Sequence, residues 1–350
     1  MTEVALAGYG RYVPDTVVTG GEIAAQSGIP ESVVTEKMGL VEKRVCQPDD
    51  DHVTDMCVEA GQRALADADV DASAVDLLCY HGSEYKDHIV WSAAANIAER
   101  LGTENAYATE SYALCAGAPV ALRQTRAGLR ADSPETALLV TASREEDLVE
   151  YGNERSSFMF NFGSGASACV LQTTERATGS PRALVRESHA VTDGSFSEDV
   201  VMPAGGSREP PSTESVERGR HSLDVPNPDS MKRRLGPVSL PNYLEVADTA
   251  LDRSGYDRTD LDFVAVTHMK RSFHDRLFDR LGLDPETDGY YLENYGHVQS
   301  ADQLIAVDEA LDRGRLGAGD VALFLAAGTG YTWAATVLDW QGTDQPVWHT

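Results

Sequence analysis

An internal repeat is the feature that most constrains how this chain can fold. In the first half, a stretch with apolar residues at three-to-four spacing (55–67) leads through a linker to a short aliphatic run (75–80). The same order returns in the second half at residues 243–253 and 263–266. Because helices and buried strands have these two patterns, each half is predicted to contain a helix followed by a strand.

The repeat then continues with a second helix and a second strand in each half. Cys115 opens a helical pattern that precedes the aliphatic run 137–140, and His297 opens one that precedes the run 322–325. Such alternation favours parallel sheets with helices packed on them. The loops that follow the strands are then expected to meet at one cleft.

Cys115 is a candidate nucleophile because of its position at the start of a helix. Small residues follow it directly, so a substrate carbonyl could approach the backbone. Unpaired N–H groups and the positive end of the helix dipole favour a thiolate there. From this segment alone, a buried and inert cysteine remains the alternative.

Further motifs stand in a fixed order along the chain. They are G-Y-G-R-Y-V-P-D-T-V-V-T, M-G-L-V-E-K-R, the Cys115 loop, F-G-S-G-A-S-A-C-V-L (162–171), M-P-A-G-G-S-R (202–208), the His268 loop, Y-G-H-V-Q-S-A (295–301) and the closing G-D-V-A-L-F-L-A-A-G-T-G-Y-T-W. In this order they resemble the ketoacyl synthase III-type condensing enzymes of the thiolase-fold superfamily. The resemblance implies an α/β thiolase fold with a duplicated, five-layer α/β/α/β/α architecture. It places the nucleophilic cysteine in an N-terminal half (1–175) and the catalytic histidines in a C-terminal half (176–350).

The same resemblance implies an acyltransferase of lipid or fatty acid biosynthesis that joins two acyl groups by Claisen condensation. The Cys115 thiolate would attack an acyl thioester and hold the acyl chain covalently. Backbone N–H groups of Cys115 and Thr329 are expected to form an oxyanion hole. His268 and His297, as neutral imidazoles, would bind the carbonyl oxygen of a second thioester while it becomes an enolate by decarboxylation or proton removal.

The chain departs from this family at His297. Synthase III enzymes usually carry asparagine in a Tyr-Gly-Asn motif, whereas this chain has Tyr-Gly-His and so resembles the elongating synthases, in which two histidines support decarboxylative condensation. Two alternatives stay open. Relatives with altered triads transfer the acyl group to oxygen or nitrogen, with histidine as general base, and the superfamily also contains non-catalytic partner subunits.

A second departure follows His268, where M-K-R (269–271) replaces the family's Gln-Ala-Asn. Arg271 is expected either to bind a malonyl-type carboxylate or to form a salt bridge with Asp275 or Asp279 on the following helix.

The family's tryptophan that stacks on the adenine of coenzyme A has no counterpart in S-V-V-T-E-K (32–37). Lys37, Lys43 and Arg44 remain candidate contacts for the phosphates of the carrier. Whether that carrier is coenzyme A or the phosphopantetheine of an acyl carrier protein stays open, and no cofactor or metal is expected.

The family also forms homodimers in which a loop residue reaches the partner's pocket. Here that loop is predicted at residues 89–92, with Val90 and Trp91 as substrate-binding residues. Residues 205–241, rich in proline, serine and charge, are interpreted as an irregular connection between the halves that covers the substrate entrance.

Composition limits the remaining possibilities. The chain has 350 residues, 42% of them hydrophobic, which is enough for two halves around a shared core. It has no signal region and no run of 18 apolar residues, so we expect a soluble, cytoplasmic protein without membrane insertion. Its five cysteines lack metal-ligand spacing, which favours a reduced chain without disulfides.

The net charge of −27 excludes nucleic acid as a partner, because phosphate repels such a surface. The basic residues are 24 arginines and only 5 lysines. This pattern predicts a halophilic protein, whose hydrated carboxylates keep it soluble while salt screens their repulsion. An acidic protein from a GC-rich genome is the alternative.

Overall fold

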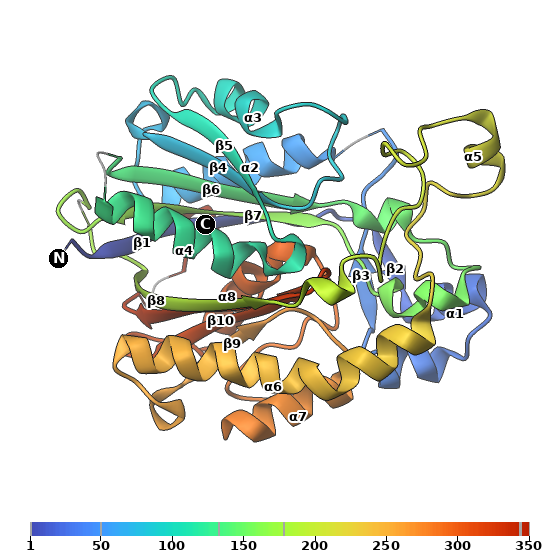
Figure 1. The fold of residues 1–350 in the computed structure, drawn as a ribbon. Coiled ribbons are helices and arrows are strands. Elements are labelled where there is room, and N and C mark those ends of the chain that lie inside the picture. The colour runs from blue at the N-terminus through green and yellow to red at the C-terminus, as the bar shows by residue number, and fades with distance from the viewer. Residues whose placement is uncertain (1, 50, 132–133, 178, 343–344, 350) are drawn as a thin grey trace.

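The structure is a computed structural model that describes residues 2–49, 51–131, 134–177, 179–342 and 345–349 (Figure 1). Its strands are β1 (Val4–Tyr12), β2 (Val17–Thr19), β3 (Glu42–Arg44), β4 (Leu77–Gly82), β5 (Tyr107–Tyr112), β6 (Thr136–Ser143), β7 (Gly165–Thr173), β8 (Ala183–Thr192), β9 (Phe263–Val266), β10 (Val321–Gly328) and β11 (Thr332–Trp340). Its α-helices are α1 (Gly20–Ser27), α2 (Val53–Asp67), α3 (Ala93–Leu101), α4 (Gly117–Ala131), α5 (Thr213–Glu217), α6 (Pro228–Ser254), α7 (Arg271–Leu281) and α8 (Asp302–Asp312).

The internal repeat is visible in the order of the strands. The large sheet has the order β5-β4-β6-β7-β1-β8-β11-β10-β9, and β2 pairs with β3 separately. In the first half, β4 is parallel to β6, β6 is antiparallel to β7, and β7 is antiparallel to β1. In the second half, β9, β10, β11 and β8 repeat these relations in turn. β5 extends the first half and has no counterpart among the described residues of the second.

Helices and strands form five layers (Figure 1). α2 and α3 cover the outer face of the first half, α6 and α7 cover that of the second half, and α4 and α8 lie between the two halves. α8 is buried at every position from Asp302 to Leu311, as expected of a helix enclosed by sheets on both sides. The predicted thiolase-type α/β/α/β/α architecture is confirmed.

The sheet is mixed, which differs from the prediction of parallel sheets. β4 is parallel to β5 and β6, and β9 is parallel to β10, but the other pairs in the sheet are antiparallel. The reason lies in the connections. Only residues 329–331 join β10 to β11, and so short a link cannot make the crossover that a parallel pair requires.

Residues 205–241 are not a connection between the halves, because they follow β8 and therefore lie within the second half. Outside α5, residues 205–227 are irregular as their composition predicts, but from Pro228 onward the chain belongs to α6. This helix contains Pro237 and Pro241 in its interior. Burial of its apolar side, including Leu240, against the sheet stabilises the helix in spite of the two prolines.

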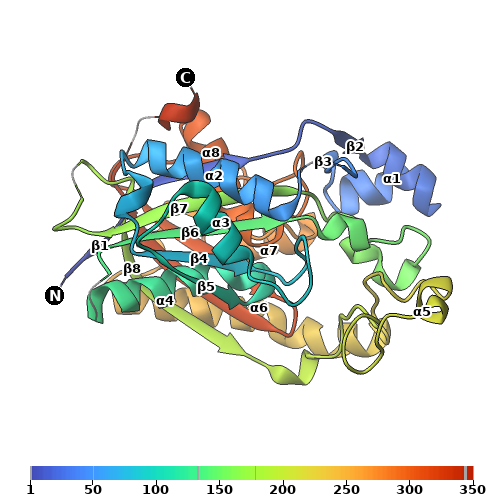
Figure 2. The same ribbon diagram turned by 90° about the horizontal axis from the view of Figure 1, so that it is seen from above.

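The predicted division after residue 175 falls in the connection from β7 to β8. This boundary remains a prediction. One sheet continues across it, since β1 and β8 pair at Ala5↔Leu184 and Leu6↔Ala183. Seen from above, α1, β2, β3 and α5 gather at one end of the molecule, while both chain ends lie toward the other (Figure 2). At that first end the backbone N–H of Val41 donates to the carbonyl of Glu293 over 2.9 Å, so the two halves also meet beside the loop that carries His297.

Candidate active site

Cys115 lies on a short 3-10 turn (Leu114–Ala116) immediately before α4. Leu114 has a φ of 50°, a left-handed conformation that leucine rarely adopts and that is found at functional turns. Gly328 of β10 packs against this turn, since a Cβ at that position would lie 2.3 Å from the carbonyl oxygen of Ala113. The sharp bend therefore needs glycine opposite it, and it leaves Cys115 5% exposed.

Two cavities meet at Cys115. The first, called here the histidine cavity, has a volume of about 390 Å³ and is lined by Cys115, both candidate histidines and residues of α6 and α7. The second, called here the loop cavity, has a volume of about 810 Å³ and is lined by Cys115, the loop between β4 and α3, and the segment after β8. Phe162 and Thr329 border both. Volumes of this size suit small organic ligands, so one thiol faces two chambers.

His297 connects Cys115 to a buried carboxylate. Its Nδ1 lies 2.6 Å from Oδ2 of Asp302, a residue with no exposed surface. Burial alone would lower the pKa of His297, but the Asp302 carboxylate and then Cys115 raise it well above its ordinary value. A nucleophile, a base and an orienting carboxylate in series are the groups that nucleophilic catalysis requires.

His268 is neutral and has a different partner. Its Nδ1 lies 2.8 Å from Nδ2 of Asn161, and its backbone N–H donates to Asp302 over 2.7 Å. Burial, followed by His297, lowers its pKa to about 3, while the carbonyl of Gly39 opposes that shift. Its Nε2 is buried without a hydrogen-bond partner among the described residues. The two histidines are therefore not the equivalent neutral pair that the sequence predicts.

Gln299 is a further polar group at the thiol. The Sγ of Cys115 donates to Oε1 of Gln299 over 2.7 Å, and Gln299 has a left-handed φ of 54°. His297 is also hydrogen-bonded to Cys115, so the thiol lies between Gln299 and His297. Sequence reasoning missed this residue, and its only signal was its place in Y-G-H-V-Q-S-A.

Glu145 is a buried carboxyl group in the wall of the loop cavity. Its Oε2 accepts hydrogen bonds from the Ser143 hydroxyl (2.5 Å) and the Arg144 backbone N–H (3.1 Å), and its Oε1 accepts one from the Ser83 hydroxyl. Burial raises its pKa to about 7 in spite of these donors. The sequence R-E-E-D (144–147) gave no sign of this, because a run of charges usually faces solvent.

Several predicted site residues come together around these cavities. Thr329 borders both of them beside Cys115, and Val90 and Trp91 line the loop cavity. Val90 is fully exposed and Ile89 nearly so. The structure thus places the predicted loop at the rim of the larger cavity.

Arg271 forms the salt bridge that was one of its two alternatives. Its Nε lies 2.8 Å from Oδ1 of Asp275, and a second ion pair joins it to Glu286. Arg271 lines neither cavity, and its charge is balanced by Asp275 of α7 and by Glu286 in the loop that follows this helix.

The three candidate phosphate contacts lie in different environments. Lys37 is exposed beside Met38, which lines the histidine cavity. Arg44 lines neither cavity. Lys43 cannot reach a carrier phosphate, because it is completely buried and donates to the carbonyl of Phe162 over 2.5 Å.

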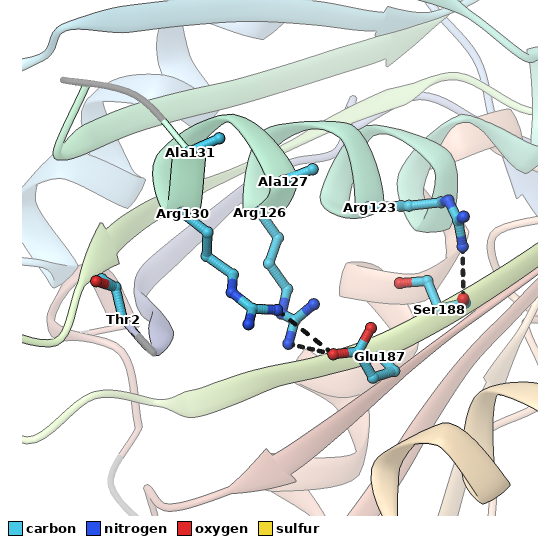
Figure 3. Close-up of a pocket in the computed structure, with 8 residues that line it drawn as sticks. All are labelled: Thr2, Arg123, Arg126, Ala127, Arg130, Ala131, Glu187 and Ser188. Atoms are coloured by element: carbon cyan, nitrogen blue, oxygen red, sulfur yellow. Dashed lines mark hydrogen bonds and ion pairs between the residues drawn. The ribbon is translucent and has the colours of Figure 1, made fainter.

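A third hollow lies between α4 and β8 (Figure 3). Arg123, Arg126 and Arg130 point from α4 toward Glu187 and Ser188 of β8. Arg123 donates to the Ser188 carbonyl over 2.5 Å, and Nη2 of Arg126 lies 2.8 Å from Oε1 of Glu187. Because these guanidinium groups are already engaged, the hollow holds α4 against β8 rather than forming a second ligand site.

One group of described residues is close enough to share a metal ion, namely Asp308, Asp312 and His349. Asp308 already accepts a hydrogen bond from the Tyr9 hydroxyl (2.9 Å) and pairs with Arg11 (2.5 Å). Its charge is therefore balanced by protein groups.

The chain matches two family models that together cover half of its length. The model of 3-oxoacyl-[acyl-carrier-protein (ACP)] synthase III matches residues 110–194, and the model of its C-terminal part matches residues 251–340. The chain belongs to the 3-oxoacyl-ACP synthase III family. The two matched regions contain Cys115, His268 and His297, and the protein is an acyltransferase of the condensing-enzyme type.

Individual relatives extend this similarity over almost the whole chain. The β-ketoacyl-[acyl-carrier-protein] synthase III of Desulfitobacterium hafniense (strain Y51) is 27% identical over 343 residues, which cover 97% of this chain and 98% of that protein. The priming β-ketosynthase of the R1128 polyketide pathway has a TM-score of 0.83 at 24% identity and covers 97% of both chains. ChlB3, described as an acyltransferase, has a TM-score of 0.81 at 23% identity and covers 99% of both chains. These two structures show a shared fold. Each helix in the described part of the chain is too short or too polar to cross a membrane.

Proposed function

We propose that this condensing enzyme forms an acyl-cysteine intermediate on Cys115 and then condenses it with a malonyl-type thioester that loses carbon dioxide. The observation that carries the proposal is that two chemically different histidines line one cavity with the Cys115 thiol. His297 has a raised pKa and a carboxylate partner, so it is suited to hold the proton that leaves Cys115. His268 is neutral, and its Nε2 is buried with no hydrogen-bond partner within the described ranges, as a donor to a developing negative charge requires.

In the first half-reaction, His297 holds the proton of Cys115, and the Cys115 thiolate attacks the carbonyl carbon of an acyl thioester. A C–S bond forms to Cys115, the C–S bond to the carrier breaks, and the departing carrier thiolate takes the proton from His297. Asp302 balances the charge on His297 during the transfer. Backbone N–H groups of Cys115 and Thr329 stabilise the tetrahedral oxyanion, and the acyl chain extends into the loop cavity.

In the second half-reaction, the malonyl-type thioester occupies the histidine cavity. Loss of carbon dioxide leaves an enolate, whose oxygen accepts a hydrogen bond from Nε2–H of His268. The enolate carbon attacks the acyl carbonyl, so that a C–C bond forms and the C–S bond to Cys115 breaks. The released thiolate then recovers a proton from water.

An oxygen- or nitrogen-acyltransferase is the second candidate, because the His297–Asp302 pair could also activate an alcohol or an amine. The two reactions differ in their products. Condensation releases carbon dioxide in step with a ketone, whereas transfer to oxygen or nitrogen releases none.

Lysines mark the side from which we propose the carrier enters. Lys232 and Lys270 are exposed and line the histidine cavity, and Lys37 stands beside it. They concentrate positive charge in a chain with a net charge of −27 and five lysines in all. Such a cluster attracts an anion, and we propose that it binds the phosphate that coenzyme A and phosphopantetheine share.

The decisive experiment is intact-mass measurement after incubation with a panel of acyl-coenzyme A thioesters. One acyl mass should be added to the native protein and to Cys46→Ala, a matched control whose buried cysteine lines neither cavity. Cys115→Ala should take up none. Acyl transfer that persists in Cys115→Ala would remove the thiol from the mechanism.

We further propose a homodimer that associates along β5. This strand ends the sheet, and it carries Tyr107 (58% exposed) and Tyr112 (42% exposed). The neighbouring loop adds the exposed Ile89 and Val90. Exposed apolar residues beside an unpaired strand edge mark an association surface. Light scattering in molar KCl should give twice 37.8 kDa for the native chain and for the control Val216→Asp, and a single 37.8 kDa species for Ile89→Asp/Val90→Asp.

A further inference from the structure

Asn161 contacts both histidines of the site. Its backbone carbonyl accepts a hydrogen bond from the N–H of His297 over 2.7 Å, and its Nδ2 lies 2.8 Å from Nδ1 of His268. Asn161 is 6% exposed and lines the histidine cavity. It is thus fixed on one side by the chain that carries His297 and presents its amide to the ring of His268 on the other.

The chemistry of the two groups determines where the proton on His268 lies. The Nδ2 of an amide can only donate, so the ring nitrogen that faces it must offer a lone pair. A neutral imidazole carries one N–H, which must then be on Nε2. Nε2 is the ring atom of His268 that is buried without a hydrogen-bond partner in the part of the chain that the structure describes.

Two other neighbours of His268 hold the residue without selecting this proton. Asp302 accepts a hydrogen bond from its backbone N–H, and the ring of Tyr291 packs at a centroid distance of 4.9 Å. Neither of these two contacts depends on which ring nitrogen is protonated, whereas the contacts with the Asn161 amide and the Gly39 carbonyl do.

We propose that Asn161 is a positioning residue that holds His268 in the Nε2–H tautomer, so that its ring can donate to the substrate oxygen. The proposal rests on the proposed donor role of His268 in condensation. Without this amide the proton could move to Nδ1, and Nε2 would then present a lone pair to the developing negative charge.

Asn161→Asp tests the proposal, because aspartate has the same shape but accepts where the amide donates. The ¹⁵N chemical shifts of His268, assigned by comparison with His268→Ala, should show Nε2 protonated in the native protein and Nδ1 protonated in Asn161→Asp. Decarboxylation of a malonyl thioester by the acylated variant should fall about 10²-fold, the cost of losing one oxyanion donor. Acylation of Cys115 should stay close to the native rate.

Asn161→Ala separates this role from a merely structural one. It removes the donor without inserting an acceptor, so both tautomers should be populated and the loss of decarboxylation should be smaller than in Asn161→Asp. If Asn161 only filled space, His268 would keep the native tautomer in both variants, and that result would overturn the proposal.

Asn96→Asp is the matched control, since Asn96 and Asn161 both have a buried amide oxygen without a partner among the described residues, but Asn96 lies on α3 and lines neither cavity. In this variant the tautomer of His268 and the rates of acylation and decarboxylation should be native. Native protein with Nδ1 protonated, or an unchanged His268 tautomer in Asn161→Asp, would overturn the proposal. Decarboxylation that survives in His268→Ala would instead contradict the proposed function.

Discussion

At the scale of single residues, the two histidines differ in chemistry because they differ in partners. We expect His297→Asn to slow acylation of Cys115 by about 10²–10⁴, because asparagine supplies an N–H but cannot accept the thiol proton. His268→Ala should leave acylation intact and lower decarboxylation by about 10²–10³. Rapid-quench mass spectrometry measures the first step, and release of carbon dioxide from acylated enzyme measures the second. Equal losses of both steps in both variants would contradict this division.

Glu145 should make stability depend on pH. Its pKa is about 7 in the folded protein against 4.5 ordinarily, so the folded state binds the proton more tightly. Protonated Glu145 therefore contributes about 3 kcal/mol to the free energy of unfolding. This contribution is complete below about pH 4.5 and is lost as the pH rises through 7. Glu145→Gln should flatten this decrease in the free energy of unfolding, measured by denaturant titration between pH 5 and 8. The exposed control Glu104→Gln should keep the native slope, and an unchanged slope in Glu145→Gln would refute the assignment.

At the scale of elements, the approach of β10 to the Cys115 turn depends on glycine. Gly328→Ala would place a Cβ 2.3 Å from the Ala113 carbonyl, so the turn must move away from β10. We expect acylation to fall at least about 10²-fold, since small misplacements at a reacting centre have this cost. Gly128→Ala, in α4 with open space around it, should instead stabilise the protein by about 0.5–1 kcal/mol and leave acylation unchanged. Rates of acyl-enzyme formation and thermal unfolding of both variants check this.

The same scale shows how far the sequence could predict the structure. Hydrophobic periodicity located β9 at Phe263–Val266 and the helix that begins after Cys115, because both patterns are local. It could not locate Asn161 beside His268, since these residues are 107 positions apart and meet only through the packing of the two halves. The first part of Pro228–Ser254 is predicted to be irregular but is helical, because tertiary burial outweighs the effect of two prolines.

At the scale of the whole molecule, the net charge of −27 destabilises the folded state, because the acidic side chains repel one another. The distance over which charges interact falls from about 10 Å at 0.1 M salt to about 3 Å at 1 M, so salt should relieve this repulsion. We expect the free energy of unfolding to increase steadily between 0.1 and 2 M KCl. Sucrose of equal osmolality is the control, because it does not screen charge, and it should give a smaller increase. Full stability in dilute buffer would show that the acidic surface is not an adaptation to salt.

The meeting of two cavities at Cys115 also determines the order in which substrates bind and products leave. The first carrier must leave the histidine cavity before the second thioester can enter it. The enzyme should therefore alternate between a free and an acylated form and show ping-pong kinetics. A product with a long chain would still lie threaded through both chambers when its last covalent bond breaks. Its exit, rather than the chemistry, should then limit turnover, and the longest chains should be the slowest to leave.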